Sequence, residues 1–305
     1  MSSGPLQPVV AFVGQTATGK SDLAIEFARQ VDGEIVNADA MALYRGMDIG
    51  TAKVPPQERQ GVPHHLFDVL DVSQEASVAI YQQQARAAIE AIRNRNKTAI
   101  LVGGSGLYVR AALDEIDFPP TDPHLRAWLY ERVEVEGLEV LYRELEKKDP
   151  AAAATIQPRN DRRIVRALEV ITLTGKPFAA SLPTPKYVYP TVQIALTLDQ
   201  VELDKRIEHR VDQMWNKGLA SETQSLLAAG LATGPTAARA VGYAETMRYL
   251  SGELNAEETR ALIAQNTRQL ARRQRRWFAR DDRVIYLPAF STVAQVQSAI
   301  ATAGA

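Results

Sequence analysis

Cysteine is entirely absent from the 305 residues of the chain. That absence excludes disulfide bonds and cysteine-ligated zinc, and it is typical of proteins that work in a reducing compartment. The sequence also lacks any apolar run near the roughly 20 residues that a helix needs to cross a bilayer. Its first residues, MSSGPLQP, lack the charged and apolar zones of a signal peptide. We therefore expect a cytoplasmic protein with no membrane segment.

An excess of charge of either sign is lacking as well, because 35 Lys and Arg residues face 36 Asp and Glu residues. This balance argues against a protein that coats nucleic acid indiscriminately, although a basic face can still exist. Arginines gather in two segments, RNDRRIVR (159–166) and TRQLARRQRRWFAR (267–280). Either segment can be a solvated helix face or a surface that binds anions. The hydrophobic content of 46% is sufficient for a sizeable core.

Apolar runs alternate with helical patterns in the first third of the chain. Three runs have the composition of buried parallel strands, namely 9–13, 34–39 and 98–103. Helical spacing of apolar residues follows the first run at 21–31 and precedes the third at 76–96. This alternation predicts an α/β fold with a parallel sheet flanked by helices, and it places ligands at the carboxyl ends of the strands.

After Leu113 the pattern changes to helical segments that prolines interrupt, and no strand is evident before residue 191. We therefore predict a helical insertion domain. A strand over 191–198 returns the chain to the core, helices follow to about Arg280, and a last strand covers 283–287. The predicted organisation is a first core part (5–113), the insertion (114–190), and a second core part with C-terminal helices (191–305).

The segment GQTATGKS (14–21) matches the phosphate-binding pattern G-x-x-x-x-G-K-[ST], known as a P-loop. Backbone N–H groups of such a loop surround an oxyanion, its lysine adds positive charge, and the last hydroxyl can ligate magnesium. We therefore predict a phosphate site in which Ser21 holds Mg²⁺. The predicted phosphate-binding residues are Gly14, Gln15, Thr16, Ala17, Thr18, Gly19, Lys20 and Ser21.

Asp39 stands at the end of the second predicted strand, on the sheet edge where the P-loop should lie. A carboxylate there can hold magnesium or act as a general base on a nucleophile. It can equally cap a short helix begun by MALY (41–44), because Asp is common at helix N-termini. The third strand ends in Gly103 and Gly104 and offers no acid, although hydrolytic NTPases normally carry one at that point.

Seven segments, in order from Val9 to Phe278, resemble the tRNA dimethylallyltransferases, which are also called tRNA isopentenyltransferases. They are GQTATGKS, EIVNADAMALYRGMDIGTAK, LVGGSGLY, DRRIVRALEV with TGKP, RIEHRVDQM, RAVGYAE and TRQLARRQRRWF. The resemblance implies a P-loop kinase-like core with a helical insertion domain that helps to hold the tRNA anticodon stem-loop. It also implies a monomer.

The activity that the resemblance implies is transfer of a dimethylallyl group from dimethylallyl diphosphate to tRNA. The acceptor is the exocyclic N6 amine of the adenosine 3′ of the anticodon. The P-loop, Mg²⁺ and Arg210 would hold the departing diphosphate, which is electrostatic stabilisation of developing negative charge. Asp39 would act as the general base on the amine. The implied catalytic residues are Lys20, Ser21, Asp39 and Arg210.

Residues in several segments match family positions that contact tRNA. They are Asp39, Ala40, Met41, Ala42, Ser105, Arg126, Arg162, Arg163, Ile164, Val165, Arg166, Arg239, Ala240, Val241, Gly242, Tyr243 and Ala244. The arginines of 267–280 stay open between RNA contact, pairing with acidic residues and exposure to solvent. Ala40 and Ala42 differ from the commoner family residues, serine and glutamine, and so present fewer polar groups to the target adenine.

Three other functions are compatible with a P-loop protein of this composition. A transferase acting on free adenine nucleotide would not need the arginine-bearing insertion. A small-molecule kinase that uses ATP does not explain the segment YRGMDIGTAK (44–53). An RNA-binding protein with an inactive site would not need Lys20 and Asp39 together.

Histidines and aromatic residues give weaker signals. The adjacent His64 and His65 lack a third ligand at a recognisable spacing, so we expect a structural role in place of metal binding. Tyr108 could stack on a base, whereas Trp277 and Phe278 are expected in the core.

Overall fold

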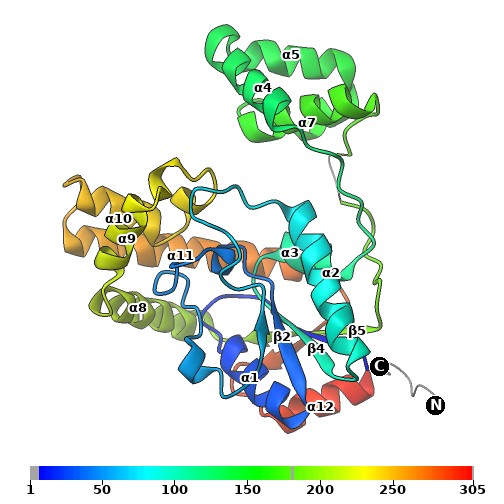
Figure 1. Cartoon of the computed structure of the whole chain (residues 1–305), viewed down its shortest axis with the longest axis vertical. Helices are drawn as coiled ribbons and strands as arrows, with labels where there is room; N and C mark the ends of the chain where they lie inside the picture. The colour runs from blue at the N-terminus through cyan, green and yellow to red at the C-terminus, as the bar shows by residue number, and fades with distance from the viewer. Residues whose placement is uncertain (1–6, 180–181, 304–305) are drawn as a thin grey trace. The chain divides into compact units, whose positions relative to one another are not determined.

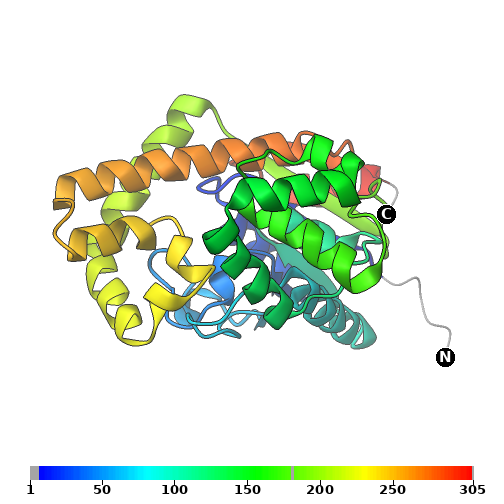
Figure 2. The same cartoon turned by 90° about the horizontal axis from the view of Figure 1, so that it is seen from above.

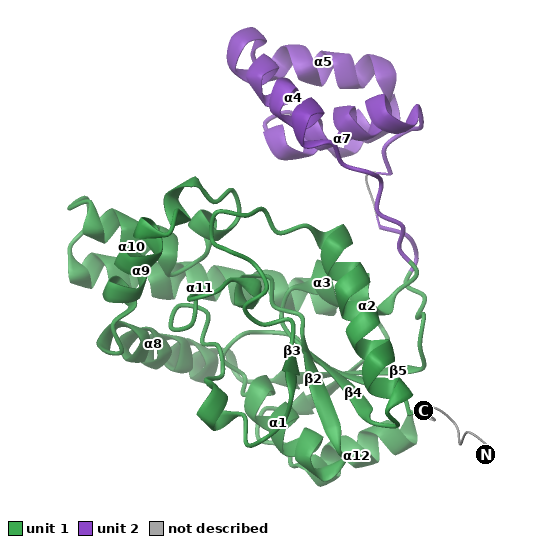
Figure 3. Cartoon of the chain, in the orientation of Figure 1, with its two compact units in different colours: residues 1–115, 185–305 green, residues 116–184 purple. Residues whose placement is uncertain are grey.

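The computed structural model describes residues 7–179 and 182–303, and it divides the chain into two compact units (Figures 1 and 3). Unit 2 comprises Ile116–Thr184, and unit 1 comprises the chain before and after it. The predicted ends of the core, at Pro5 and Ala305, lie outside the described residues. Within 7–179 and 182–303, no helix has the length and apolar character needed to span a bilayer.

Unit 1 is built on a six-stranded sheet in which every neighbouring pair of strands is parallel. The strand order is β3-β2-β4-β1-β5-β6. The strands are β1 (Val9–Val13), β2 (Gly33–Asn37), β3 (His64–His65), β4 (Thr98–Val102), β5 (Thr191–Thr197) and β6 (Val284–Pro288). The predicted α/β fold is confirmed. β3 is not among the predicted strands, because a strand of two residues has no periodicity to detect.

Helices cover both faces of the sheet. The chain moves from β1 to β2 in one direction across the sheet and from β2 back to β4 in the other. Right-handed connections therefore place α1 (Lys20–Gln30) and α2 (Val78–Asn94) on opposite faces. α3 (Gly106–Leu113), which follows β4, packs beside α2.

A helix that the sequence analysis does not predict, α12 (Val293–Thr302), lies beside α1 (Figure 1). Its apolar side chains join those of α1 over Phe12 and Ile194 of the sheet. A capping box marks its start, because Thr292 accepts from the Gln295 N–H while the Gln295 side chain accepts from the Thr292 N–H. That pattern in the sequence is the signal that identifies the helix.

A group of helices after β5 forms the second part of unit 1. They are α8 (Gln200–Asn216), α9 (Leu219–Ala228), α10 (Tyr243–Leu250) and α11 (Ala256–Phe278). α11 packs against α8, α10 and α3, so it joins this group to the sheet (Figure 2, orange). Short 3-10 helices complete the unit, namely η1 (Met41–Leu43), η2 (Pro56–Glu58), η3 (Leu231–Thr233) and η4 (Ala237–Arg239).

Unit 2 is helical and has its own core. Its helices are α4 (Pro123–Glu136), α5 (Leu138–Lys148), α6 (Pro150–Thr155) and α7 (Asp161–Thr174). Leu129, Leu141, Leu145 and Leu168 are buried together in its centre. Its bounds, Ile116–Thr184, are narrower than the predicted 114–190. The reason is that Asp114 and Tyr187 form an antiparallel bridge within unit 1.

Asp114 lies where the chain leaves unit 1, and its carboxylate is almost fully buried. Arg110 Nε donates to its Oδ2 at 2.6 Å, and Arg283 Nη1 donates to its Oδ1 at 2.8 Å. The Arg283 guanidinium also binds Asp281 at 2.6 Å and lies 3.8 Å from the centre of the Tyr187 ring. One arginine therefore anchors both connecting segments of the insertion to unit 1.

Arg283→Met should lower the free energy of unfolding by about 3 kcal/mol, because it leaves a buried carboxylate with one partner fewer. Arg283→Lys keeps the charge and should cost less, although lysine cannot reproduce the forked pairing. Urea unfolding of the full chain measures both. Equal stability of Arg283→Met and the wild type would contradict the anchoring role.

Candidate active site

The P-loop connects β1 to α1, and several of its residues line a cavity. Ala17 and Gly19 have φ of 64° and 88°, left-handed conformations of the kind that build anion-binding turns. Ala17 adopts this conformation at a cost that glycine would not have, which marks a constrained loop. Thr16 N donates to Gln274 Oε1 of α11 at 2.8 Å. The loop is therefore held from both the sheet and the C-terminal helices.

Lys20, the first residue of α1, is buried beneath the loop, and its Nζ donates to the carbonyl oxygen of Gln15. Burial, together with repulsion from Arg210, lowers the pKa of Lys20 to about 8, although Asp39 acts in the opposite direction. An anion placed in the loop would favour the protonated form. Lys20 is therefore suited to a phosphate ligand. Without an anion, burial and repulsion from Arg210 disfavour its protonated form.

Arg210 reaches the P-loop from α8. Its Nη1 donates to Thr16 Oγ1 at 3.3 Å, and burial lowers its pKa below the usual value. Two cations, Lys20 and Arg210, thus share one small region of low solvent exposure. Such an arrangement binds phosphate oxygens well, because the planar guanidinium can contact two of them at once.

Asp39 follows β2 and is fixed by the side chain of Asn37. Asn37 Oδ1 accepts from the Asp39 N–H at 2.9 Å, and Asn37 Nδ2 donates to the Asp39 carbonyl oxygen at 2.9 Å. Asp39 Oδ1 accepts from the Met41 N–H at 2.9 Å, so its side chain satisfies the first amide of η1, although the N-cap position itself is Ala40. Asp39 also lines the same cavity as the P-loop. The bond to η1 is therefore compatible with a place in the site.

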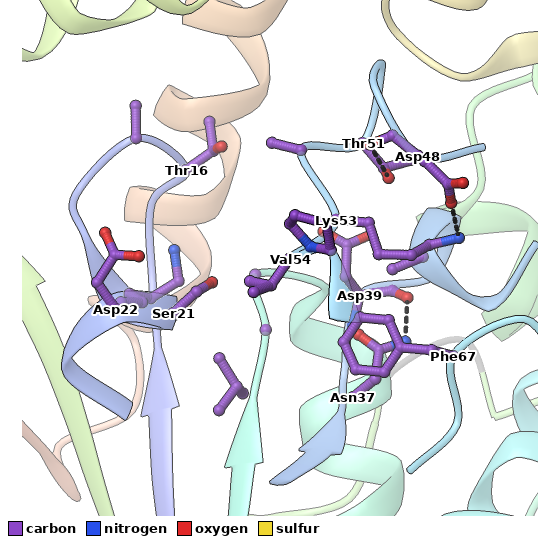
Figure 4. Close-up of a pocket in the computed structure, with 18 of the residues that line it drawn as sticks. Thr16, Ser21, Asp22, Asn37, Asp39, Asp48, Thr51, Lys53, Val54 and Phe67 are labelled. Atoms are coloured by element: carbon purple, nitrogen blue, oxygen red, sulfur yellow. Dashed lines mark hydrogen bonds and ion pairs between the residues drawn. The ribbon is translucent and has the colours of Figure 1, made fainter. Parts of the chain in front are cut away.

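A cavity of about 530 Å³ brings these residues together. Thr16 and Ser21 lie across it from Asp39 and Lys53 (Figure 4). The cavity also has an apolar part formed by Val54, Phe67, Ile35 and Val102. It can accept a ligand that is anionic at one end and apolar at the other.

A second cavity of about 100 Å³ adjoins the first. Residues shared by both are Thr16, Asp39, Thr51, Ala52, Arg210, Met214 and Gln274. The smaller cavity is otherwise mostly apolar, with Ile207, Val211, Ile263 and Leu270 in its wall. Asp39 and the P-loop are thus accessible from two chambers.

Asn37 and Gln274 are site residues that the sequence analysis does not identify. In the sequence, Asn37 is visible only as part of a strand. Gln274 carries a signal, because it is a polar residue in line with the buried Ala271 and Phe278 of α11. Its bond to Thr16 links residues 258 positions apart, which no local pattern encodes.

The residues of unit 1 that are predicted to contact RNA differ in their exposure and in their contacts. Ser105 Oγ accepts from the Ala40 N–H at 3.1 Å and so supports the Asp39 turn. Arg239 is exposed, whereas Tyr243 is fully buried and donates to Glu222 Oε1 at 2.6 Å. The remaining positions contribute small or apolar groups: Met41, Val241 and Ala244 are half-buried, and Ala42, Ala240 and Gly242 are buried.

In unit 2, two predicted RNA-contacting arginines converge on Glu169, which is fully buried. Arg126 Nη2 lies 3.1 Å and Arg166 Nη1 lies 2.7 Å from Glu169 Oε2. Arg166 also donates to the carbonyl oxygens of Pro119 and Pro120. Arg162 and Arg163 are exposed on α7, and Ile164 and Val165 are buried in the core of the unit. A side-chain contact from α7 to RNA would therefore come from its arginines.

The arginines of α11 show two of the predicted situations. Arg268 pairs with Glu208 at 3.0 Å. Four others near the end of the helix are exposed, namely Arg272, Arg273, Arg275 and Arg276, and so is Arg280 just beyond it. Phe278 is buried as expected, but Trp277 is 36% exposed.

Tyr108 and the two histidines make contacts inside unit 1. The Tyr108 ring packs on that of Tyr81 at 4.6 Å between centroids. His65 Nε2 lies 2.7 Å from Glu34 Oε2, and His64 Nδ1 lies 2.8 Å from the Val62 carbonyl oxygen. These side chains thus make packing and polar contacts within unit 1.

Known proteins resemble this chain over nearly its whole length. Residues 42–281 match the family described as IPP transferase. Proteins named tRNA dimethylallyltransferase include one from Kineococcus radiotolerans, 53% identical over 291 residues (93% of this chain, 92% of that protein). Another, from Streptomyces coelicolor, is 54% identical over 288 residues (94% of this chain, 92% of that protein).

Solved structures are similar as well. A full-length tRNA isopentenylpyrophosphate transferase from Bacillus halodurans has a TM-score of 0.71 at 36% identity and covers 97% of this chain and 98% of that one. A eukaryotic dimethylallyltransferase acting on tRNA has a TM-score of 0.78 at 27% identity, covering 98% of this chain and 77% of that one.

Binding of an alkyl diphosphate should weaken as the pH rises above about 8, because Lys20 must then regain a proton to meet the anion. The loss should approach tenfold for each pH unit, roughly 1.4 kcal/mol. Isothermal titration calorimetry in buffers of different ionisation enthalpy should register proton uptake above this pH. Lys20→Met should bind weakly at every pH without that slope. Proton release on binding, or a wild-type affinity that does not change with pH, would contradict the role of Lys20.

Proposed function

The chain belongs to the IPP transferase family, and we propose that it transfers the dimethylallyl group of dimethylallyl diphosphate to the N6 amine of the adenosine 3′ of the anticodon in tRNA. Membership confirms the family resemblance of the sequence. The observation that carries the proposal is that a phosphate cradle and a carboxylate, Asp39, line one cavity with an apolar part. We expect the enzyme to act in the cytoplasm as a monomer.

The diphosphate of the donor lies in the P-loop in this proposal. Lys20 and Arg210, which lie at the loop, would donate to it together with the loop amides. Ser21 is the residue that would hold Mg²⁺, since it lines the cavity and both its hydroxyl and diphosphate oxygens are the hard ligands that this ion prefers. Bound magnesium adds positive charge where the leaving group gains negative charge.

Asp39 is the proposed general base. The adenine nitrogen attacks the first carbon of the dimethylallyl group, the carbon–oxygen bond to the diphosphate breaks, and the amine proton passes to the carboxylate. One oxygen of Asp39 accepts from the Met41 N–H, and an ionised carboxylate retains further acceptor positions for the amine. Because adenine N6 is a weak nucleophile, alignment by fixed groups must supply much of the rate.

The target base has to leave its stack in the anticodon loop to reach Asp39. The apolar wall of the smaller cavity suits a flat, uncharged base, and the first cavity suits the prenyl diphosphate. Arginines of unit 2 are the proposed contacts to the RNA backbone. Arg126 and Arg166 are already ordered by Glu169, and Arg162 and Arg163 are exposed.

Labelled dimethylallyl diphosphate tests the function and its alternatives together. It should label unmodified tRNA and leave free AMP unlabelled, and added ATP should change neither result. Labelling of AMP alone would identify a nucleotide prenyltransferase. A P-loop kinase would consume ATP without moving the prenyl label, and an inactive RNA-binding protein would bind tRNA without labelling it.

Asp39→Asn should lower turnover by about two to four orders of magnitude while donor and tRNA affinities persist. The asparagine oxygen can still accept from the Met41 N–H, so the turn keeps its geometry. Single-turnover assays with separate binding measurements distinguish these effects. Glu58→Gln is the control, because it removes an exposed acid at the same cavity and should leave turnover near the wild-type rate. Undiminished turnover of Asp39→Asn would remove the base from the mechanism.

Replacing Arg162 and Arg163 by alanine should weaken tRNA binding and flatten its salt dependence. The log–log salt slope should fall by about 0.7 to 0.9 for each phosphate that the variant no longer neutralises. The matched control replaces Arg143 and Lys147, two exposed cations of α5 in the same unit. Binding measured over a salt series decides the matter. An unaltered slope in the α7 variant would show that these arginines form a solvated helix face and do not contact phosphates.

A further inference from the structure

One carboxylate holds three consecutive backbone amides of the loop that follows Met47. Glu222 of α9 accepts from the N–H of Ile49 at 2.8 Å and of Gly50 at 3.2 Å. The Asp48 N–H lies 3.3 Å from its Oε2. A side chain 174 positions away in the sequence thus fills the anion-binding face of this turn.

Tyr243 makes this attachment tighter. Its hydroxyl donates to Glu222 Oε1 at 2.6 Å and accepts from the Gly50 N–H at 3.1 Å. The ring is fully buried, and a β-carbon on Gly50 would come within 2.4 Å of it. The loop is therefore fixed in one position against the first residue of α10.

The far end of the loop is tied down separately. Lys53 is 3% exposed, and its Nζ donates to the carbonyl oxygen of Tyr44 at 2.9 Å and to Asp48 and Asp68 at 2.6 Å each. Between Gly50 and Lys53 lie only two residues, Thr51 and Ala52. Their position follows from the two attachments.

Thr51 and Ala52 line both cavities, so this short segment forms part of the wall that the two chambers share. Val54, which follows the Lys53 attachment, belongs to the apolar part of the larger cavity (Figure 4). A displacement of the loop would enlarge one chamber and narrow the other. It would change the room for the prenyl group without touching the P-loop.

We propose that Glu222, with Tyr243, is a positioning residue that holds this part of the shared wall and thereby sets the length of prenyl chain that the enzyme accepts. The inference rests on the proposed prenyl transfer. It assigns Tyr243 a role in shaping the donor chamber in place of a side-chain contact with RNA. Glu222 acts through the amides of Ile49 and Gly50 and does not touch the reacting atoms.

Glu222→Ala is the principal test, measured with dimethylallyl diphosphate and with the longer geranyl diphosphate as donors. The ratio of their kcat/KM values should shift toward the longer donor by about tenfold, the scale on which an apolar pocket discriminates added carbons. Glu222→Gln keeps an acceptor oxygen and should shift the ratio less. Tyr243→Phe should lie between them. The rate of hydrogen exchange at residues 48–52 should rise from Glu222→Gln through Tyr243→Phe to Glu222→Ala.

Glu245→Gln is the matched control. This buried carboxylate accepts from the Gly242 N–H at 2.7 Å and from Asn266 at 2.6 Å, at the same end of α10. The Glu245→Gln substitution should weaken the contact between α10 and α11 without altering the ratio of the two donors. An unchanged donor ratio in Glu222→Ala, or an equal shift in Glu245→Gln, would overturn the proposal. If the wild type labels no tRNA, the proposed function fails, while exchange at 48–52 still shows whether Glu222 holds the loop.

Discussion

The close approach of two loops across the end of β4 is the constraint on which the site depends. β4 lies between β1 and β2, so the P-loop and the Asp39 turn can meet only by passing over its last residues. A β-carbon on Gly103 would lie 2.2 Å from the Ala38 carbonyl, and one on Gly104 would lie 2.9 Å from the Gly14 oxygen. Hydrogen alone fits at both positions. The acid that hydrolytic NTPases carry at this point is therefore absent for a steric reason, because no side chain fits at Gly103 or Gly104.

Electrostatic repulsion between the site's own cations opposes the fold and favours an anionic ligand. Lys20 is buried beside the half-buried Arg210, and burial and repulsion from Arg210 lower the Lys20 pKa. Asp39 offsets part of this repulsion. An anion that binds only the folded protein stabilises it by an amount that grows with the logarithm of the ratio of its concentration to its Kd. A diphosphate in the P-loop would therefore strengthen the same packing that creates the cradle.

Local sequence patterns are sufficient for the parts of the protein whose physics is local. Periodicity predicts the parallel sheet, the P-loop motif predicts its own position between β1 and α1, and the loss of strands after Leu113 predicts the insertion. The sequence leaves Asp39 open between cap and site; in the structure its carboxylate accepts from the first amide of η1 and also lines the cavity. Pairing between distant side chains is beyond such patterns. Gln274 binds Thr16 and Glu222 binds the amides of Ile49 and Gly50, each from a helix whose amphipathic pattern is ordinary, because long-range hydrogen bonds leave no periodic trace.

The arginines of unit 2 illustrate how burial changes the meaning of a charged run. A flexible surface arginine loses side-chain entropy when it binds phosphate, which reduces the affinity that it can provide. Glu169 is buried between Arg126 and Arg166 and fixes both before any ligand arrives. Two guanidinium groups against one carboxylate retain a net positive charge. The same contact that stabilises unit 2 therefore leaves an ordered pair of arginines with a net positive charge.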